Sequence, residues 1–179
     1  MLPGITIVIS PLISLMSDQV KALNQAGVHA AYINSSLTEN QIRAALLYAA
    51  QGQYKIIYVA PERLNTMRFL DFACRADISM VTVDEAHCIS QWGQDFRPSY
   101  LEIADFLARL PRRPVVSAFT ATATERVKQD ITGSLHLQNP VTVVTGFDRP
   151  NLFFRVVKRK GGKETDNSIC LLYTSDAAD

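Results

Sequence analysis

The segment ISMVTVDEAH, residues 78–87, decides the fold class of this chain. Its first part, Ile78–Val83, consists of apolar and β-branched residues apart from one serine, which predicts a strand buried on both faces. Two carboxylates, Asp84 and Glu85, follow the strand directly. Because open α/β sheets bind their ligands outside the carboxyl ends of the strands, we expect this acidic pair at the functional edge of a parallel sheet.

Strand patterns alternate with helix patterns on both sides of this segment, which predicts an α/β fold with a parallel sheet covered by helices on both faces. The helical patterns begin at recognisable start signals: Ser10 as an N-cap with Pro11 at the first helical position, a capping box at Thr38–Gln41, Pro61, Pro98, and a second capping box at Thr122–Glu125. The further predicted strands are Ile5–Ile9, Tyr54–Val59, Val115–Phe119, Val141–Thr145 and Leu152–Val157.

Composition excludes several classes of protein. The chain has 179 residues and a net charge of +1, so it is no broadly basic nucleic-acid binder, and any nucleic-acid contact must be local. Its three cysteines, Cys74, Cys88 and Cys170, include no C-x-x-C pair, which disfavours a disulfide framework and a structural zinc site. The apolar runs are too short to cross a membrane and no signal peptide precedes them, so we expect an intracellular protein, in the cytoplasm or nucleoid if it is bacterial.

The acidic pair suits nucleotide hydrolysis. In such a site the first carboxylate, Asp84, serves Mg²⁺ through its water shell, and the second, Glu85, orients the attacking water. His87 lies on the segment that leaves the pair and suits a relay role. The alternatives are a solvated acidic turn and a buried structural histidine. Metal binding by His87 and Cys88 is disfavoured because no partner ligands occur at a suitable spacing.

An aromatic segment follows at once. Trp92, Phe96 and Arg97 lie within a few residues of one another, and Gly93 and Pro98 argue against a continuous helix through them. Such a loop can stack on unpaired bases, and its position beside the acidic pair would let DNA contact move the catalytic residues. The alternative is a loop whose aromatic side chains pack under the domain.

Together these strings resemble the RecQ family of superfamily-two helicases. The DEAH sequence at 84–87 resembles motif II and is followed by the aromatic-rich loop of that family. The other matching segments are Thr6–Val20 for motif Ia, Tyr58–Leu64 for motif Ib, Ser117–Thr124 for motif III, and Gly146–Leu152 for the end of the first motor domain.

The resemblance implies a RecA-like fold of the P-loop NTPase type, ATP and Mg²⁺ as ligands, single-stranded and duplex DNA as partners, and 3′→5′ unwinding in repair and recombination. It implies that Asp84 serves Mg²⁺-ATP, that Glu85 activates water, and that His87 links the ATP site to motif III. It assigns single-stranded DNA sensing to Trp92, Phe96 and Arg97, and transmission of the nucleotide state to Thr120 and Thr122. Residues along the DNA track would be Ser10, Pro11, Gln19, Pro61, Glu62 and Arg63, although helix caps and satisfied turns also explain several of these.

The expected organisation is a partial first motor domain at 1–157, a linker at 158–167 and an unmatched tail at 168–179, which we interpret as an artefact of a truncated or chimeric reading frame. No G-x-x-x-x-G-K-[ST] string occurs in the sequence. The expectation is therefore an N-terminally truncated piece of a longer protein, inactive alone because the phosphates lack their backbone cradle and a second motor domain with its arginine finger is missing. Two other functions stay open: a D-E-A-H RNA helicase fragment, and a non-catalytic nucleic-acid-binding remnant.

Overall fold

The central element is a five-stranded parallel sheet. The structure, a computed structural model, describes residues 3–93 and 95–145. The strands follow the order β2-β3-β1-β4-β5, and all neighbours are parallel. Their bounds are β1 Ile5–Ile9, β2 Ala30–Ile33, β3 Ile56–Val59, β4 Ile78–Val83 and β5 Val115–Ala118.

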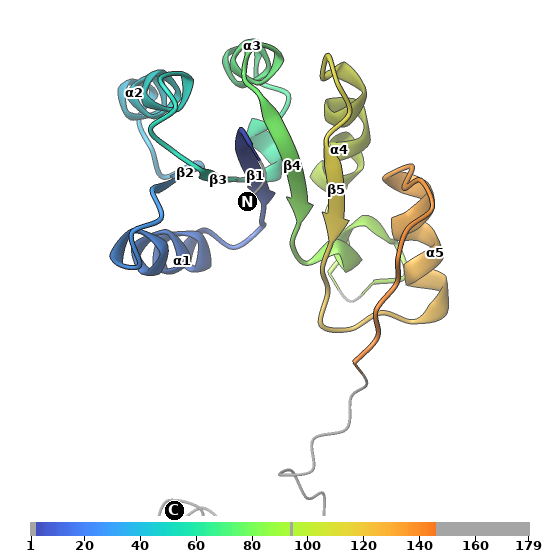
Figure 1. The fold of residues 1–179 in the computed structure, drawn as a ribbon. Helices are drawn as coiled ribbons and strands as arrows, with labels where there is room; N and C mark the ends of the chain where they lie inside the picture. Colours follow the sequence, from blue (N-terminus) through green and yellow to red (C-terminus); the bar gives the residue numbers. More distant parts are fainter. Residues whose placement is uncertain (1–2, 94, 146–179) are drawn as a thin grey trace, which may run out of the picture. The chain divides into compact units, whose positions relative to one another are not determined.

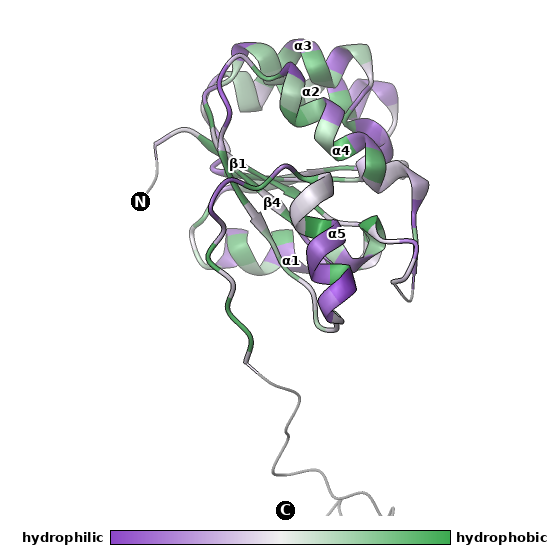
Figure 2. Ribbon diagram, turned by 90° about the vertical axis from the view of Figure 1, so that its right-hand side faces the viewer, coloured by the Kyte–Doolittle hydropathy of each residue, from purple (hydrophilic) through white to green (hydrophobic). Residues whose placement is uncertain are grey.

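Helices cover both faces of this sheet, as the sequence predicts. Helices α1 (Ile13–Gln25) and α5 (Glu125–Ser134) lie on one face, and α2 (Glu39–Ala50), α3 (Met67–Arg75) and α4 (Pro98–Arg109) lie on the other (Figures 1 and 2). Two short 3₁₀ turns, η1 (Pro61–Arg63) and η2 (Ala86–Ile89), follow β3 and β4. Among the described helices, none is both long and apolar enough to cross a bilayer.

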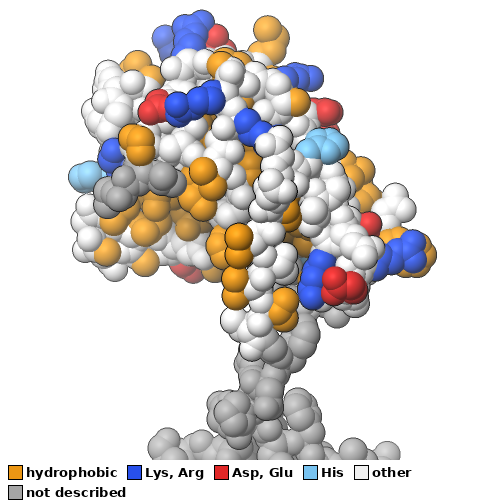
Figure 3. Space-filling model, turned by 45° about the vertical axis from the view of Figure 1, so that its right-hand side comes forward, with side chains coloured by type: hydrophobic (Ala, Val, Ile, Leu, Met, Phe, Trp, Pro, Cys, Tyr) orange, Lys and Arg blue, Asp and Glu red, His pale blue; other side chains and the backbone are white. Residues whose placement is uncertain are grey.

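The charged side chains do not form one continuous basic surface on the face drawn in Figure 3. Lys and Arg, in blue, stand there in small separate groups with acidic side chains nearby. This distribution agrees with the net charge of +1 and favours local rather than extended contact with an anionic partner.

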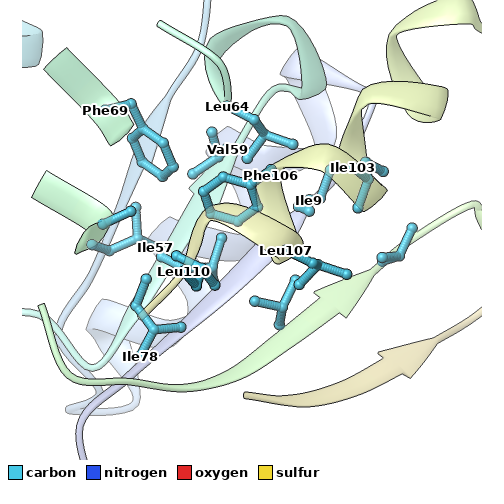
Figure 4. Close-up of a cluster of buried hydrophobic side chains, with 14 of the residues drawn as sticks. Ile9, Ile57, Val59, Leu64, Phe69, Ile78, Ile103, Phe106, Leu107 and Leu110 are labelled. Atoms are coloured by element: carbon cyan, nitrogen blue, oxygen red, sulfur yellow. The ribbon is translucent and has the colours of Figure 1, made fainter. Parts of the chain in front are cut away.

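The core lies mainly between the sheet and the three-helix layer. Strand residues such as Ile9 and Val59 are fully buried and pack against side chains of α3 and α4 (Figure 4). Phe69 of α3 and Phe106 of α4 meet with ring centroids 5.8 Å apart. Burial of strand side chains on this scale explains why β1 and β4 are apolar nearly throughout.

The predictions for β1, β3, β4, β5, α2 and α4 are confirmed to within one or two residues at each end. The capping box of α2 is also confirmed, since Thr38 accepts from the Gln41 backbone and Gln41 bonds back to Thr38. The elements that the sequence pattern did not reveal are β2 and α3. Strand β2 has four residues, and α3 has nine and no side-chain hydrogen bond at its N-cap, so neither carries a strong local signal.

Two predicted caps are wrong. Helix α1 has Leu12 as its N-cap, because Ser10 still belongs to the sheet edge: its N–H bonds to the Val59 carbonyl at 3.2 Å. Helix α5 is capped by Thr124, whose hydroxyl accepts from Val127. Thr122 lies in the preceding turn, where its backbone bonds to the Thr120 side chain.

The chain divides into two compact units, residues 1–140 and 141–179. The strand predicted at Val141–Thr145 is wrong, since these residues have no regular secondary structure and Val141 is 91% exposed. A β-branched run forms a strand only where a neighbour supplies hydrogen bonds, so composition alone misleads here. The strand predicted at 152–157, the linker, the tail and the Gly146–Leu152 segment lie outside the described residues.

Truncation of the core at Phe106 tests this packing. Phe106→Ala should lower the free energy of unfolding by about 3–5 kcal/mol, because the site is fully buried and a cavity remains. Leu101→Ala on the same helix, where the side chain is half exposed, is the matched control and should cost less than about 1 kcal/mol. Urea unfolding followed by circular dichroism measures both, and equal losses would contradict the assigned core.

Candidate functional site

The predicted site residues gather at the carboxyl edge of the three strands β1, β4 and β5. The sheet register aligns Ile9 with Val83 and Val83 with Ala118, so these strands end at the same level. The residues that follow them, among them Ser10 and Asp84, therefore meet at one edge, as the parallel topology requires.

Asp84 is fixed by four hydrogen bonds. Its backbone N–H donates to the Ile9 carbonyl at 2.8 Å, and its own carbonyl accepts from the Tyr100 hydroxyl at 2.9 Å. One carboxylate oxygen accepts from the Ser10 hydroxyl at 3.2 Å, and the other accepts from the Glu85 N–H at 3.0 Å. The carboxylate is thus held in one orientation while it stays partly open to solvent.

Glu85 occupies a strained backbone position. Its φ of 47° and ψ of 44° lie in the left-handed region, which costs a non-glycine residue roughly 1–2 kcal/mol. The turn is held there because the next residue, Ala86, donates to the Phe119 carbonyl and Phe119 donates to the Val83 carbonyl, both at 2.8 Å. Strands β4 and β5 therefore impose the turn that separates the Glu85 side chain from that of Asp84.

His87 joins this turn to the segment after β5. Its Nδ1 lies 3.0 Å from the Thr120 hydroxyl oxygen and 3.3 Å from a Glu85 carboxylate oxygen. The Thr120 hydroxyl donates its own proton to the Thr122 carbonyl at 3.0 Å, so it can only accept from His87. His87 is therefore protonated on Nδ1, and the predicted link between motif II and motif III exists as a physical contact.

The aromatic loop packs back onto the same turn. Ser90 is buried, and its hydroxyl donates to Asp130 of α5 at 2.5 Å while it accepts from the Trp92 N–H at 3.1 Å. A Cβ at Gly93 would overlap the His87 carbonyl oxygen, so this close approach requires glycine. Trp92 itself is 64% exposed, which excludes the alternative that it packs under the domain.

Arg97 connects the loop to the residues after β1. Its guanidinium pairs with Asp95 at 2.7 Å and donates to the Pro11 carbonyl at 3.4 Å. Phe96 is half-buried beside it. The structure thus brings Arg97 of the predicted loop and Pro11 together.

The remaining residues of the predicted DNA track are not equally available. Ser10 is fully buried and bonds to Asp84, so its hydroxyl belongs to the acidic site. Pro61 is buried in η1, Glu62 is exposed, and Gln19 of α1 is partly exposed. Arg63 is partly buried and lies 3.9 Å from Glu39 at the start of α2.

Burial raises the pKa of two hydroxyls and one thiol near the site. It raises the pKa of Tyr100 above its usual range, and the neutral Tyr100 hydroxyl donates its proton to the Asp84 carbonyl. Burial, with a smaller effect of Asp84, also raises the pKa of Tyr58. Burial and the charge of Asp95 raise the pKa of Cys88 to about 11.

A cavity of about 720 Å³ lies at the other edge of the sheet, lined by residues such as Gly4, Lys55 and Asp77 that precede the strands. Within residues 3–93 and 95–145, no group of three or more His, Cys, Asp or Glu side chains could enclose a metal ion.

The comparisons with known proteins agree with this geometry. A family model described as DEAD/DEAH box helicase matches residues 2–131. The chain belongs to the DEAD/DEAH box helicase family. The crystal structure of the Pyrococcus furiosus Hef helicase domain superposes with a TM-score of 0.55 at 16% identity, covering 76% of this chain and 28% of that one. This likeness confirms the RecA-like fold.

The resemblance to RecQ helicases is also confirmed. The chain is 52% identical to the ATP-dependent DNA helicase RecQ of Bacillus subtilis over 158 residues, which cover 88% of this chain and 27% of that protein. It is 43% identical to RecQ of Pasteurella multocida, covering 87% and 24% of the two chains, and 42% identical to the mouse bifunctional 3'-5' exonuclease/ATP-dependent helicase WRN, covering 88% and 11%. The chain therefore spans about a quarter of the length of these bacterial RecQ relatives.

Side chains that sequence reasoning missed come mostly from α5. Arg126 and Asp130 touch the aromatic loop, and no local motif marks them. The Tyr100 hydroxyl bond to Asp84 was missed as well, although Tyr100 ends the aromatic segment. Such contacts join residues from different elements, so only the fold reveals them.

Thiol reactivity tests the environment assigned to Cys88. A Cys74→Ser/Cys170→Ser variant, which keeps only Cys88, should react with a thiol reagent at pH 8 about a hundredfold more slowly than an ordinary thiol, because a pKa of about 11 instead of 9 leaves a hundredfold less thiolate. The control variant Cys88→Ser/Cys170→Ser keeps the exposed Cys74 and should react at the ordinary rate. The difference should vanish in urea, and equal rates in the folded proteins would contradict the assignment.

Proposed function

We propose that this chain is a part of the first motor domain of a RecQ-type ATP-dependent DNA helicase, which couples ATP hydrolysis to 3′→5′ unwinding in DNA repair and recombination. The observation that carries the proposal is the cluster at the ends of β1, β4 and β5, where the Glu85 carboxylate lies beside His87 and the aromatic loop packs against the turn that holds both residues. The ATP-dependent DNA helicase names of its relatives support it.

Asp84 would hold Mg²⁺ at this site. Its two carboxylate oxygens already accept hydrogen bonds from Ser10 and Glu85, and the remaining lone pairs suit the water shell of a hard cation. The open cluster fits Mg²⁺, which commonly binds through one or two carboxylates together with substrate phosphates. When bound, the ion would neutralise charge on the β- and γ-phosphate oxygens of ATP.

Glu85 would orient and polarise the attacking water. The left-handed turn carries its carboxylate away from that of Asp84 and toward His87, 3.3 Å away. His87, protonated on Nδ1, can donate either to this carboxylate or to the Thr120 hydroxyl. A shift of Thr120 would therefore change how His87 holds the catalytic carboxylate, and Thr122 would take part through its backbone.

DNA would bind along the surface next to this cluster. Trp92 is the candidate for stacking on an unpaired base, with Phe96 and Arg97 beside it, and an aromatic–base stack is worth on the order of 1–3 kcal/mol. The proposed track continues over the motif Ia and motif Ib residues Pro11, Gln19, Pro61, Glu62 and Arg63. Ser10, being buried against Asp84, would act on the track only through the acidic site. Arg97 would have to exchange its Asp95 partner for a phosphate.

DNA rather than RNA is favoured by the aromatic loop and by the relatives, which are named DNA helicases. The proposal includes a partial first motor domain at 1–157, a linker at 158–167 and, in the longer protein, a second motor domain that supplies the arginine finger. The proposed function also implies an intracellular protein, because its DNA substrate lies inside the cell.

Removal of the general base tests the proposal. In a protein of the relatives' length that carries this chain, Glu85→Gln should lower DNA-stimulated ATP turnover by about 10²- to 10⁴-fold, because the amide cannot accept the proton of the attacking water. Glu102→Gln, an exposed position on α4, is the matched control and should retain turnover. Normal turnover of the Glu85 variant, measured by phosphate release with single-stranded DNA, would overturn the proposed function.

A further inference from the structure

Helix α5 makes two contacts with the aromatic loop from one face. Asp130 accepts the hydroxyl proton of Ser90 at 2.5 Å, which fixes the base of the loop. Arg126, one helical turn earlier and therefore on the same face, places its guanidinium carbon 3.8 Å from the centroid of the Trp92 ring. The loop is thus held at two points by a helix that none of the sequence motifs includes.

The contact between Arg126 and Trp92 covers one face of the indole only. A guanidinium at 3.8 Å is in stacking contact, yet Trp92 remains 64% exposed. One guanidinium can stack on only one face of a ring, so the exposed surface of Trp92 includes indole surface that Arg126 does not cover. An indole that is backed on one side and bare on the other has lost part of its rotational freedom without losing its stacking surface, which is the arrangement that lowers the entropic cost of binding.

We propose that Arg126 is a positioning residue that stacks behind Trp92 and holds the free face of the indole ready for an unpaired base. The inference rests on the proposed function, because it assumes that Trp92 stacks on single-stranded DNA. Arg126 also adds a positive charge beside the bound strand. Thr124, the N-cap of α5, follows two residues after Thr122, whose carbonyl accepts from the Thr120 hydroxyl, so the same helix connects the base-stacking surface to the His87 contact.

The single tryptophan of the chain gives a direct readout of the Arg126 contact without DNA. In the 179-residue chain, Arg126→Ala should increase the quenching of Trp92 fluorescence by acrylamide, because the covered face becomes accessible. Lys128→Ala is the matched control: it removes the same charge from the same helix, but Lys128 pairs with Glu125 at 3.1 Å. Equal quenching in the Arg126 and Lys128 variants would overturn the contact.

Binding of a labelled single-stranded oligothymidylate, followed by anisotropy, tests the positioning role. Arg126→Ala should weaken binding about two- to fivefold, the equivalent of a cation–π contact at an exposed site. Lys128→Ala should weaken it less, and Arg126→Lys, which keeps the charge but not the planar stack, should fall between the original chain and Arg126→Ala. In the background of Trp92→Ala, loss of Arg126 should add no more than the loss of Lys128 does.

The same binding measurements distinguish a wrong DNA contact at Trp92 from a wrong positioning role for Arg126. If Trp92→Ala leaves oligothymidylate affinity unchanged, the proposed DNA contact of Trp92 is wrong and the positioning role falls with it. If Trp92→Ala weakens binding but the effects of Arg126→Ala and Trp92→Ala simply add, the DNA contact stands and the role assigned to Arg126 is overturned.

Discussion

The backbone hydrogen bonds that hold the turn after β4 between β1 and β5 are the constraint on which the candidate site depends. Asp84 bonds to Ile9 on one side, and on the other Phe119 accepts from Ala86 and donates to Val83. These bonds leave Glu85 no ordinary backbone conformation, so it takes the left-handed one. Strain of this kind persists only where the surrounding structure over-determines it, and three aligned parallel strands supply that surrounding.

In the proposed function, ATP and DNA would influence each other through the same turn. His87 leaves the turn toward Thr120, while the loop that starts at Ser90 returns to it through the close approach of Gly93. Helix α5 connects the Thr120 segment to the loop, because it follows Thr120 in the chain and Asp130 accepts a hydrogen bond from Ser90 of the loop. A change at any one of these points must be accommodated by the others, since packed contacts of this kind have few alternative arrangements.

Much of this architecture could be predicted from the sequence, for identifiable reasons. Strands such as Ile78–Val83 can be recognised from their apolar residues alone. The parallel topology then places Asp84 at the functional edge. The predicted cap at Ser10 failed because a serine before a proline looks the same whether its hydroxyl caps a helix or, as here, bonds to a carboxylate distant in sequence. The role of Arg126 had no local signal at all, since its contact with Trp92 exists only through the packing of α5.

The central claim is that bound DNA changes the activity of the acidic pair through His87 and Thr120. The substitution Thr120→Val tests this claim most directly. In a protein of the relatives' length, the ratio of ATP turnover with and without single-stranded DNA should fall about five- to tenfold, the equivalent of losing about one buried hydrogen bond. Thr122→Val is the matched control, because Thr122 bonds to Thr120 through its backbone N–H and carbonyl. An unchanged ratio in the Thr120 variant would contradict the account.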